Sequence, residues 1–159
     1  MNTAMTLEEV KNWFLSRQSM SPKKLQKMLY YAYSWGLVLL NDDNESFDNK
    51  LFDANFEAWV HGPVIPDIYF EYKPYGFQNI PQLDSISPNP EDDDVTDVLE
   101  QVLSVYGGFN GNQLESLTHS EEPWKNARKG LLPMDSSSNV IDDRTVSYTH
   151  LTLPTNSRV

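Results

Sequence analysis

The chain has 159 residues, 39% of them hydrophobic, which is the length of one domain that can bury a single core. It contains no cysteine, and this excludes disulfides, thiolate metal ligands and a cysteine nucleophile. The 23 acidic and 12 basic residues give a formal net charge of -11. Such a field repels phosphate backbones, so we expect no nucleic-acid partner.

The first residues lack the basic, apolar and small-residue pattern of a signal peptide. No apolar run approaches the ~18 residues that a membrane span needs. We therefore expect a cytoplasmic protein that has no membrane partner, and the absence of cysteine fits a reducing compartment.

Two helix start signals lie in the first part of the chain. Thr6 and Glu9 have the spacing of a capping box, and Ser21 followed by Pro22 places a cap before a residue suited to the first helical position. Apolar residues then recur at three- and four-residue steps over residues 22–40, with aromatic residues on nearly every side. We expect this segment to be the central helix. The lysines at its start are interpreted as a solvated face: Lys23, Lys24 and Lys27.

Residues 51–60 are rich in aromatic residues and contain a turn-forming Asp-Ala-Asn, which predicts a small β-hairpin. Gly62 and Pro63 are expected to end it, and Pro66 suits the first turn of another helix. Further helix starts follow at an acidic run, at an asparagine, at a serine and at a serine-rich segment, near residues 92, 110, 120 and 139. The pattern as a whole predicts a mainly helical α+β domain, with about six helices around the 22–40 helix and a small hairpin at 51–60.

The final segment, residues 146–159, has no helical stripe and a composition unlike the rest of the chain. We interpret residues 1–145 as the domain and residues 146–159 as a non-native read-through tail. The alternative is that these residues form a genuine short strand. If they are not native, the last helix, expected at 139–145, is truncated and leaves one side of the core open.

His61 and His119 are the histidines outside that tail. Histidine is the usual general acid or base near neutral pH, so a hydrolase that uses either residue is one hypothesis. However, no zinc-ligand spacing and no phosphate-binding glycine loop is present, and we expect neither a metal site nor catalytic residues. The other hypothesis is structural, with His119 at a helix end above Trp124. Convergence of both histidines with carboxylates in a deep cleft would favour the hydrolase.

Three stretches carry a family resemblance. They read K-L-Q-K-M-L-Y-Y-A-Y-S-W at 24–35, F-E-A-W-V-H-G-P-V-I-P at 56–66 and L-T-H-S-E-E-P-W-K-N-A-R at 117–128. In order and approximate spacing they resemble the SocA-like or Panacea antitoxin domain, a phage-associated protein family, over residues 6–145. The resemblance implies an antitoxin that neutralises a cognate toxin by direct protein–protein binding, without a cofactor and without enzymatic activity.

The same resemblance leaves a second interaction role open, an adaptor of phage or mobile-element origin that presents a client to a protease. The acidic run at 91–94 is either a solvated helix start or a complement to a basic toxin. Tryptophans in the matched stretches belong to the core or anchor an interface. The candidate partner-binding residues, all within the matched stretches, are Tyr31, Trp35, Trp59, His61, Pro63, His119 and Trp124.

Overall fold

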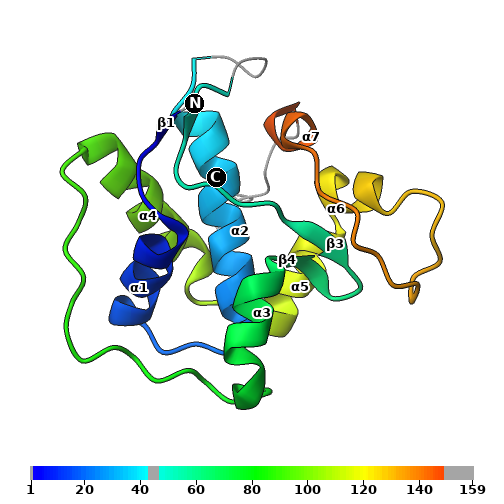
Figure 1. Cartoon of the computed structure of the whole chain (residues 1–159), viewed down its shortest axis with the longest axis horizontal. Helices are drawn as coiled ribbons and strands as arrows, with labels where there is room; N and C mark the ends of the chain where they lie inside the picture. The colour runs from blue at the N-terminus through cyan, green and yellow to red at the C-terminus, as the bar shows by residue number, and fades with distance from the viewer. Residues whose placement is uncertain (1, 43–46, 149–159) are drawn as a thin grey trace.

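The computed structural model describes residues 2–42 and 47–148 of the chain. Helix α2 runs through the middle of the molecule, with α1 and α4 on one side and the β3–β4 hairpin, α5 and α6 on the other (Figure 1). This arrangement confirms the predicted mainly helical α+β domain around a central helix. In chain order the elements are β1 (Asn2–Thr3), α1 (Leu7–Arg17), α2 (Pro22–Leu39), β2 (Asn49–Lys50), β3 (Glu57–Trp59), β4 (Gly62–Val64), α3 (Pro66–Tyr72), the 3-10 helix η1 (Lys73–Tyr75), α4 (Asp93–Tyr106), α5 (Gly111–His119), α6 (Glu122–Ala127) and α7 (Asp143–Tyr148).

The start of α2 follows the predicted chemistry. The Ser21 hydroxyl accepts a hydrogen bond from the Lys24 amide at 3.1 Å, and Pro22 occupies the first turn, where its missing N–H leaves no partner unsatisfied. Apolar residues on several sides of the helix are buried, because α1, α3, α4, α5 and α7 all contact it. Each fully buried Leu or Met side chain contributes about 1.5–3 kcal/mol to folding. Helix α2 is therefore the centre of the core.

Aromatic side chains fill much of the space around α2, and several of their polar tips have partners, although the buried Tyr30 hydroxyl has no hydrogen-bond partner among the described residues. The Tyr31 ring stacks on Tyr106 with a centroid distance of 4.0 Å. The Tyr106 hydroxyl accepts a 2.9 Å bond from Trp35 Nε1, and the Tyr31 hydroxyl donates to Glu121 at 3.1 Å. Tyr33 donates to the Asp143 carboxylate at 3.0 Å. Burial of amphipathic rings is favourable when such bonds replace water.

The hairpin lies further along the chain than predicted. Strands β3 and β4 pair antiparallel through residues 57–64, whereas residues 51–60 were expected, and Gly62 and Pro63 form the second strand and do not end the hairpin. Gly62 has φ +114°, a region that a residue without Cβ enters at little cost, and this permits the tight turn. Gly62 therefore allows the chain to reverse direction at a position where the hairpin was expected to end.

Pro63 is tolerated in β4 because of its position opposite Ala58. The Ala58 N–H donates to Asn139 O at 2.8 Å, and Ala58 O accepts from Arg128 Nη1 at 2.9 Å. The amide that proline lacks would therefore have no ladder partner at this register. Local sequence does not reveal this tolerance, because the partners of Ala58 lie 70 or more residues away along the chain.

The residues that were expected to begin the hairpin have another role. Leu51 and Phe52 are fully buried in the core. Immediately before them, β2 pairs in parallel with β1, and the Met5 amide donates to Leu51 O at 2.8 Å. This pairing was not predicted, since it joins two-residue strands that are far apart in the chain.

The C-terminal part of the described chain also differs from the prediction. Residues 139–141 are extended beside β3, with Ile141 N donating to Phe56 O at 2.8 Å, and α7 begins only at Asp143. Val146 lies in α7 and is buried in the core. Residues 146–148, the first three of the segment interpreted as a read-through tail, thus belong to a helix and not to a strand, and residues 149–159 lie outside the described residues. Across the described chain, no helix combines the length and apolar character needed to cross a bilayer.

Candidate functional site

The three stretches that carry the family resemblance meet at one place in the fold. The first half of α2, the β3–β4 turn and the C-terminal end of α5 converge on the Glu115 carboxylate. Lys23 Nζ lies 2.6 Å from Glu115 Oε1, His61 Nδ1 lies 3.0 Å from Oε2, and His119 Nε2 lies 3.9 Å from Oε2. We call these four residues, Lys23, His61, Glu115 and His119, the Glu115 cluster.

Two members of the Glu115 cluster have shifted pKa values. Burial acts to raise the pKa of Glu115, but the hydrogen bonds from Lys23 and His61 outweigh it, so the pKa lies below its ordinary value. Burial lowers the pKa of His119; Glu115 opposes this shift and the Lys27 amine adds to it. Glu115 is therefore an ionised acceptor at neutral pH that holds side chains from α2 and the hairpin together.

His119 and Trp124 stack, as the structural interpretation of the sequence expected. Their ring centroids are 3.9 Å apart and the planes differ by 19°. Trp124 Nε1 donates to Trp59 O at 2.8 Å, and the Arg128 guanidinium lies 5.3 Å from the Trp124 ring. These contacts fasten α5 and α6 to the hairpin and orient the His119 ring.

The lysines at the start of α2 do not form the solvated face that was predicted. Lys24 is buried and its Nζ donates to Gly107 O at 2.5 Å. Lys27 is 1% exposed, and burial lowers its pKa to about 7. A Cβ at position 62 would lie 2.7 Å from Lys27 Cε, so the turn at Gly62 covers this side chain. The hairpin turn covers Lys27 and the C-terminal end of α4 meets Lys24, and the local charge pattern contains no sign of these long-range contacts.

The structure separates the predicted partner-binding residues into three groups. Tyr31 and Pro63 are buried, so their side chains do not reach the surface. Trp35 is half-buried and its indole is bonded to Tyr106. The remaining four lie together around the Glu115 cluster and reach the surface in part or in full: Trp59, His61, His119 and Trp124.

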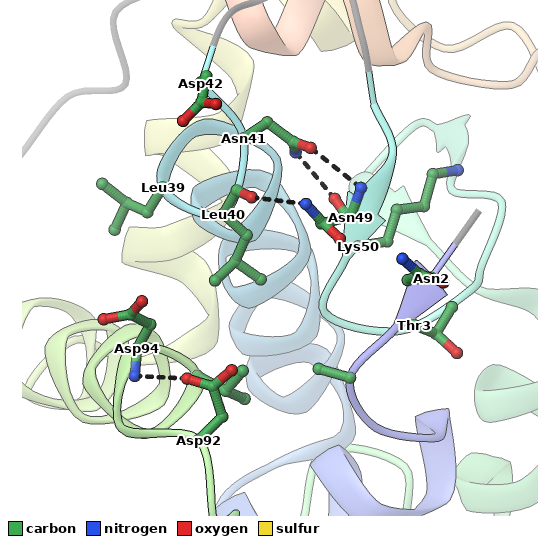
Figure 2. Close-up of a pocket in the computed structure, with 12 residues that line it drawn as sticks. Asn2, Thr3, Leu39, Leu40, Asn41, Asp42, Asn49, Lys50, Asp92 and Asp94 are labelled. Carbon is green, nitrogen blue, oxygen red and sulfur yellow. Dashed lines mark hydrogen bonds between the residues drawn. The ribbon is translucent and has the colours of Figure 1, made fainter.

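The Glu115 cluster lies at the surface, because the His61 side chain is 65% exposed. A cavity of about 450 Å³ is found elsewhere, at the other end of α2 (Figure 2). About 18 Å of helix separates Leu39, at that cavity, from Lys27. The walls of the cavity include Leu40, Asn41, Asn49, Lys50, Asp92 and Asp94.

The two histidines converge on a carboxylate, as a hydrolase would require, but they do not line this cavity. Among the described residues, no group of three or more His, Cys, Asp or Glu side chains is arranged to hold a metal ion.

An exposed aromatic group beside the cluster was missed by the sequence reading. Tyr69 and Phe70 are on α3, and the Trp59 ring of the hairpin lies 5.0 Å from the Tyr69 ring. Phe70 is 63% exposed and Tyr69 is 38% exposed. The signal was present, since two adjacent aromatic residues in a seven-residue helix cannot both face the core, but the direction of α3 was unknown.

Comparison with known proteins identifies the family. The family described as "Antitoxin SocA-like, Panacea domain" matches residues 25–125, from the first turn of α2 into α6. The chain belongs to this SocA-like antitoxin family. The match contains Glu115, both histidines of the cluster and Trp124, whereas Lys23 lies two residues before its start.

One curated relative of the chain is "Antitoxin SocA" from Caulobacter vibrioides (strain NA1000 / CB15N). It is 32% identical over 111 residues, which cover 63% of this chain and 55% of the relative. The chain therefore spans about half the length of the relative that it matches. No solved structure matches the chain.

Proposed function

We propose that this chain is an antitoxin that neutralises a cognate toxin by binding it directly in the cytoplasm. The observation that carries the proposal is membership of the SocA-like family over residues 25–125. The relative from Caulobacter is itself named an antitoxin, which supports the same role. The proposed activity requires no cofactor and no enzymatic step.

The geometry supports binding by a preassembled surface. Glu115 holds α2 and the hairpin turn together, the His119 and Trp124 stack joins α5 to α6, and the Trp124 indole bonds α6 to the hairpin. Because these segments are already ordered, association loses little conformational entropy. A stable complex of ordinary size buries ~1,600 Å² in total, and a few aromatic residues dominate its free energy. We place the half-buried Trp59 and the exposed His61 within that interface.

Co-expression with the product of the adjacent gene tests the proposal. We expect that product to arrest growth when expressed alone, and we expect growth to resume and a soluble complex to form when this chain is co-expressed. A non-toxic neighbour, or toxicity that persists beside soluble antitoxin, would contradict the proposal. Loss of the toxin from the cell, reversed by removing a protease, would instead indicate the adaptor role.

A second candidate function is hydrolysis by a histidine pair, and one observation favours it. His61 and His119 both approach Oε2 of Glu115, an arrangement that can orient a general base. If this function is correct, His61→Ala should abolish turnover of p-nitrophenyl esters and leave the melting temperature nearly unchanged. Under the antitoxin proposal, wild type and His61→Ala give the same background ester cleavage. His119→Ala should lower the melting temperature, since it removes the stack on Trp124.

A further inference from the structure

Three aromatic side chains form a continuous exposed group on one side of the hairpin. The Trp59 and Tyr69 rings are 5.0 Å apart, and Tyr69 and Phe70 are 5.4 Å apart. Trp59 is half-buried, whereas Phe70 is 63% exposed. We call this group, Trp59, Tyr69 and Phe70, the α3 aromatic face. Large aromatic residues gathered at a surface are typical of interface anchors.

Helix α3 presents this face from a fixed position. Gln26 of α2 makes two buried hydrogen bonds with the backbone of Ile65, the cap of α3: Nε2 donates to O at 3.0 Å and Oε1 accepts from N at 2.9 Å. Ile68 is the buried residue of α3 and ties the helix to the core. The exposed rings therefore sit on a rigid support, which favours binding because little order is lost on association. In Figure 1, α3 lies against the lower part of α2, next to the hairpin.

Carboxylates border the α3 aromatic face. Glu57 Oε1 accepts a 2.9 Å bond from Trp59 Nε1. Asp67 is exposed and stands one helical turn before Phe70, and Glu71 follows Phe70 directly. Two ammonium groups oppose them: Lys73 Nζ lies 6.0 Å from the Tyr69 ring, and the buried Lys11 pairs with Glu71 at 3.0 Å. With the net charge of -11, the acidic border favours a basic partner.

We infer that the α3 aromatic face is the anchor of the toxin interface and that it receives arginine side chains from a basic surface of the toxin. A guanidinium group stacks on an aromatic ring and at the same time pairs with a carboxylate, and this face offers both within one helical turn. The inference rests on the proposed antitoxin function and adds the surface and the chemistry of the partner.

The test measures binding of the purified product of the adjacent gene to the full chain and to four variants. Phe70→Ala removes the most exposed ring of the face, and Met134→Ala is its control, because Met134 is 76% exposed in the loop after α6. Asp67→Lys reverses a bordering charge, and Asp84→Lys makes the same change of net charge on an exposed loop. Circular dichroism verifies that each variant is folded.

We expect Phe70→Ala and Asp67→Lys each to raise Kd by about 10-fold or more, the size of an interface hot spot, while both controls stay within about 3-fold of the wild type. Asp67→Lys should also reduce the dependence of Kd on salt more than Asp84→Lys does. If the wild type binds and neutralises the toxin and all four variants bind it equally well, the inference is overturned and the antitoxin function stands.

Two other results separate the possible failures. If the wild-type chain neither binds the adjacent gene product nor rescues growth, the antitoxin function and this inference fall together. If light scattering shows that the chain alone is a dimer that Phe70→Ala converts to a monomer, the face is covered by a second copy and the inference of a toxin anchor is overturned.

Discussion

The aromatic residues around α2 and those on α3 are chemically similar, but the first group is largely buried and the second is more exposed. Tyr31 and Tyr106 are fully buried and stacked at 4.0 Å, and the hydroxyl of Tyr106 accepts a bond from Trp35. On α3, Phe70 remains 63% exposed although it is the more hydrophobic residue. Burial is thus decided by which face of which helix meets the core, and residue type does not decide it.

This contrast indicates what each aromatic group contributes. Rings around α2 contribute to folding, because water is excluded from them and several of their polar tips, such as those of Tyr31 and Tyr33, are bonded within the domain. Rings on α3 leave their apolar surface in water, so a complex can still gain free energy by burying that surface. Substitutions in the two regions should therefore change different measurements, stability in one region and affinity in the other.

The largest effect is expected in the interior. Tyr106→Ala removes the ring that stacks on Tyr31 and leaves a cavity beside α2, so we expect a loss of about 3–5 kcal/mol in the free energy of unfolding, measured by urea denaturation. Tyr106→Phe keeps the ring and removes the acceptor of Trp35 Nε1, so it should cost about 1 kcal/mol. Equal losses in the two variants would show that the stack does not support the core.

The next effect is a pH dependence that arises under the hairpin. Burial lowers the pKa of Lys27 to about 7, from 10.5 in the unfolded chain, so between these values the unfolded chain holds a proton that the folded chain lacks. Stability should therefore rise with pH, by roughly 2 kcal/mol between pH 7.5 and 9.5. Lys27→Met should remove this rise in urea denaturation series. Identical slopes in wild type and variant would show that Lys27 keeps an ordinary pKa.

A smaller effect is expected at the turn that joins the two regions. Gly62→Ala forces a side chain into φ +114° and places Cβ 2.7 Å from Lys27 Cε, so we expect a loss of about 1–2 kcal/mol. Gly108→Ala is the control, because a Cβ there meets no atom within 4 Å and the glycine does not have positive φ. Thermal unfolding that is equal in the two variants would mean that the turn can rearrange freely.

The smallest effect on stability is expected on the α3 aromatic face. Phe70→Ala should change the free energy of unfolding by no more than about 0.5 kcal/mol, as is usual for exposed positions away from caps and networks. Urea denaturation of the same sample that is used for binding provides the measurement. A loss as large as that of Tyr106→Ala would show that Phe70 belongs to the core, and the contrast between the regions would disappear.

Local signals in the sequence were sufficient for much of the helical framework. The start of α2 at Ser21 and Pro22 was correct, and the predicted capping box of Thr6 and Glu9 is formed, with bonds of 2.8 and 3.1 Å. The hairpin was misplaced because Gly62 was interpreted as a stop. A glycine can end a strand or allow a tight turn within a hairpin. Which of the two occurs depends on whether the residues after the glycine pair with another segment.

The candidate site was predicted only in part. The three matched stretches identified His61, His119 and Trp124, which the structure brings together, but Tyr31 and Pro63 turned out to be buried. Glu115, at the centre of the cluster, was not selected, since it lies just before the third stretch and has no distinctive neighbours. Glu115 bonds to Lys23 and His61 only because the fold places α5 beside α2 and the hairpin turn.

The sequence by itself determined most of the helix starts, the central helix and the family, because caps, periodicity and motif spacing are properties of neighbouring residues. Only the tertiary structure decided that Lys27 is buried, that Glu115 joins α2 to the hairpin and that Phe70 faces water. Each of these depends on segments distant in the chain meeting at a particular angle, and local spacing contains no information about that angle.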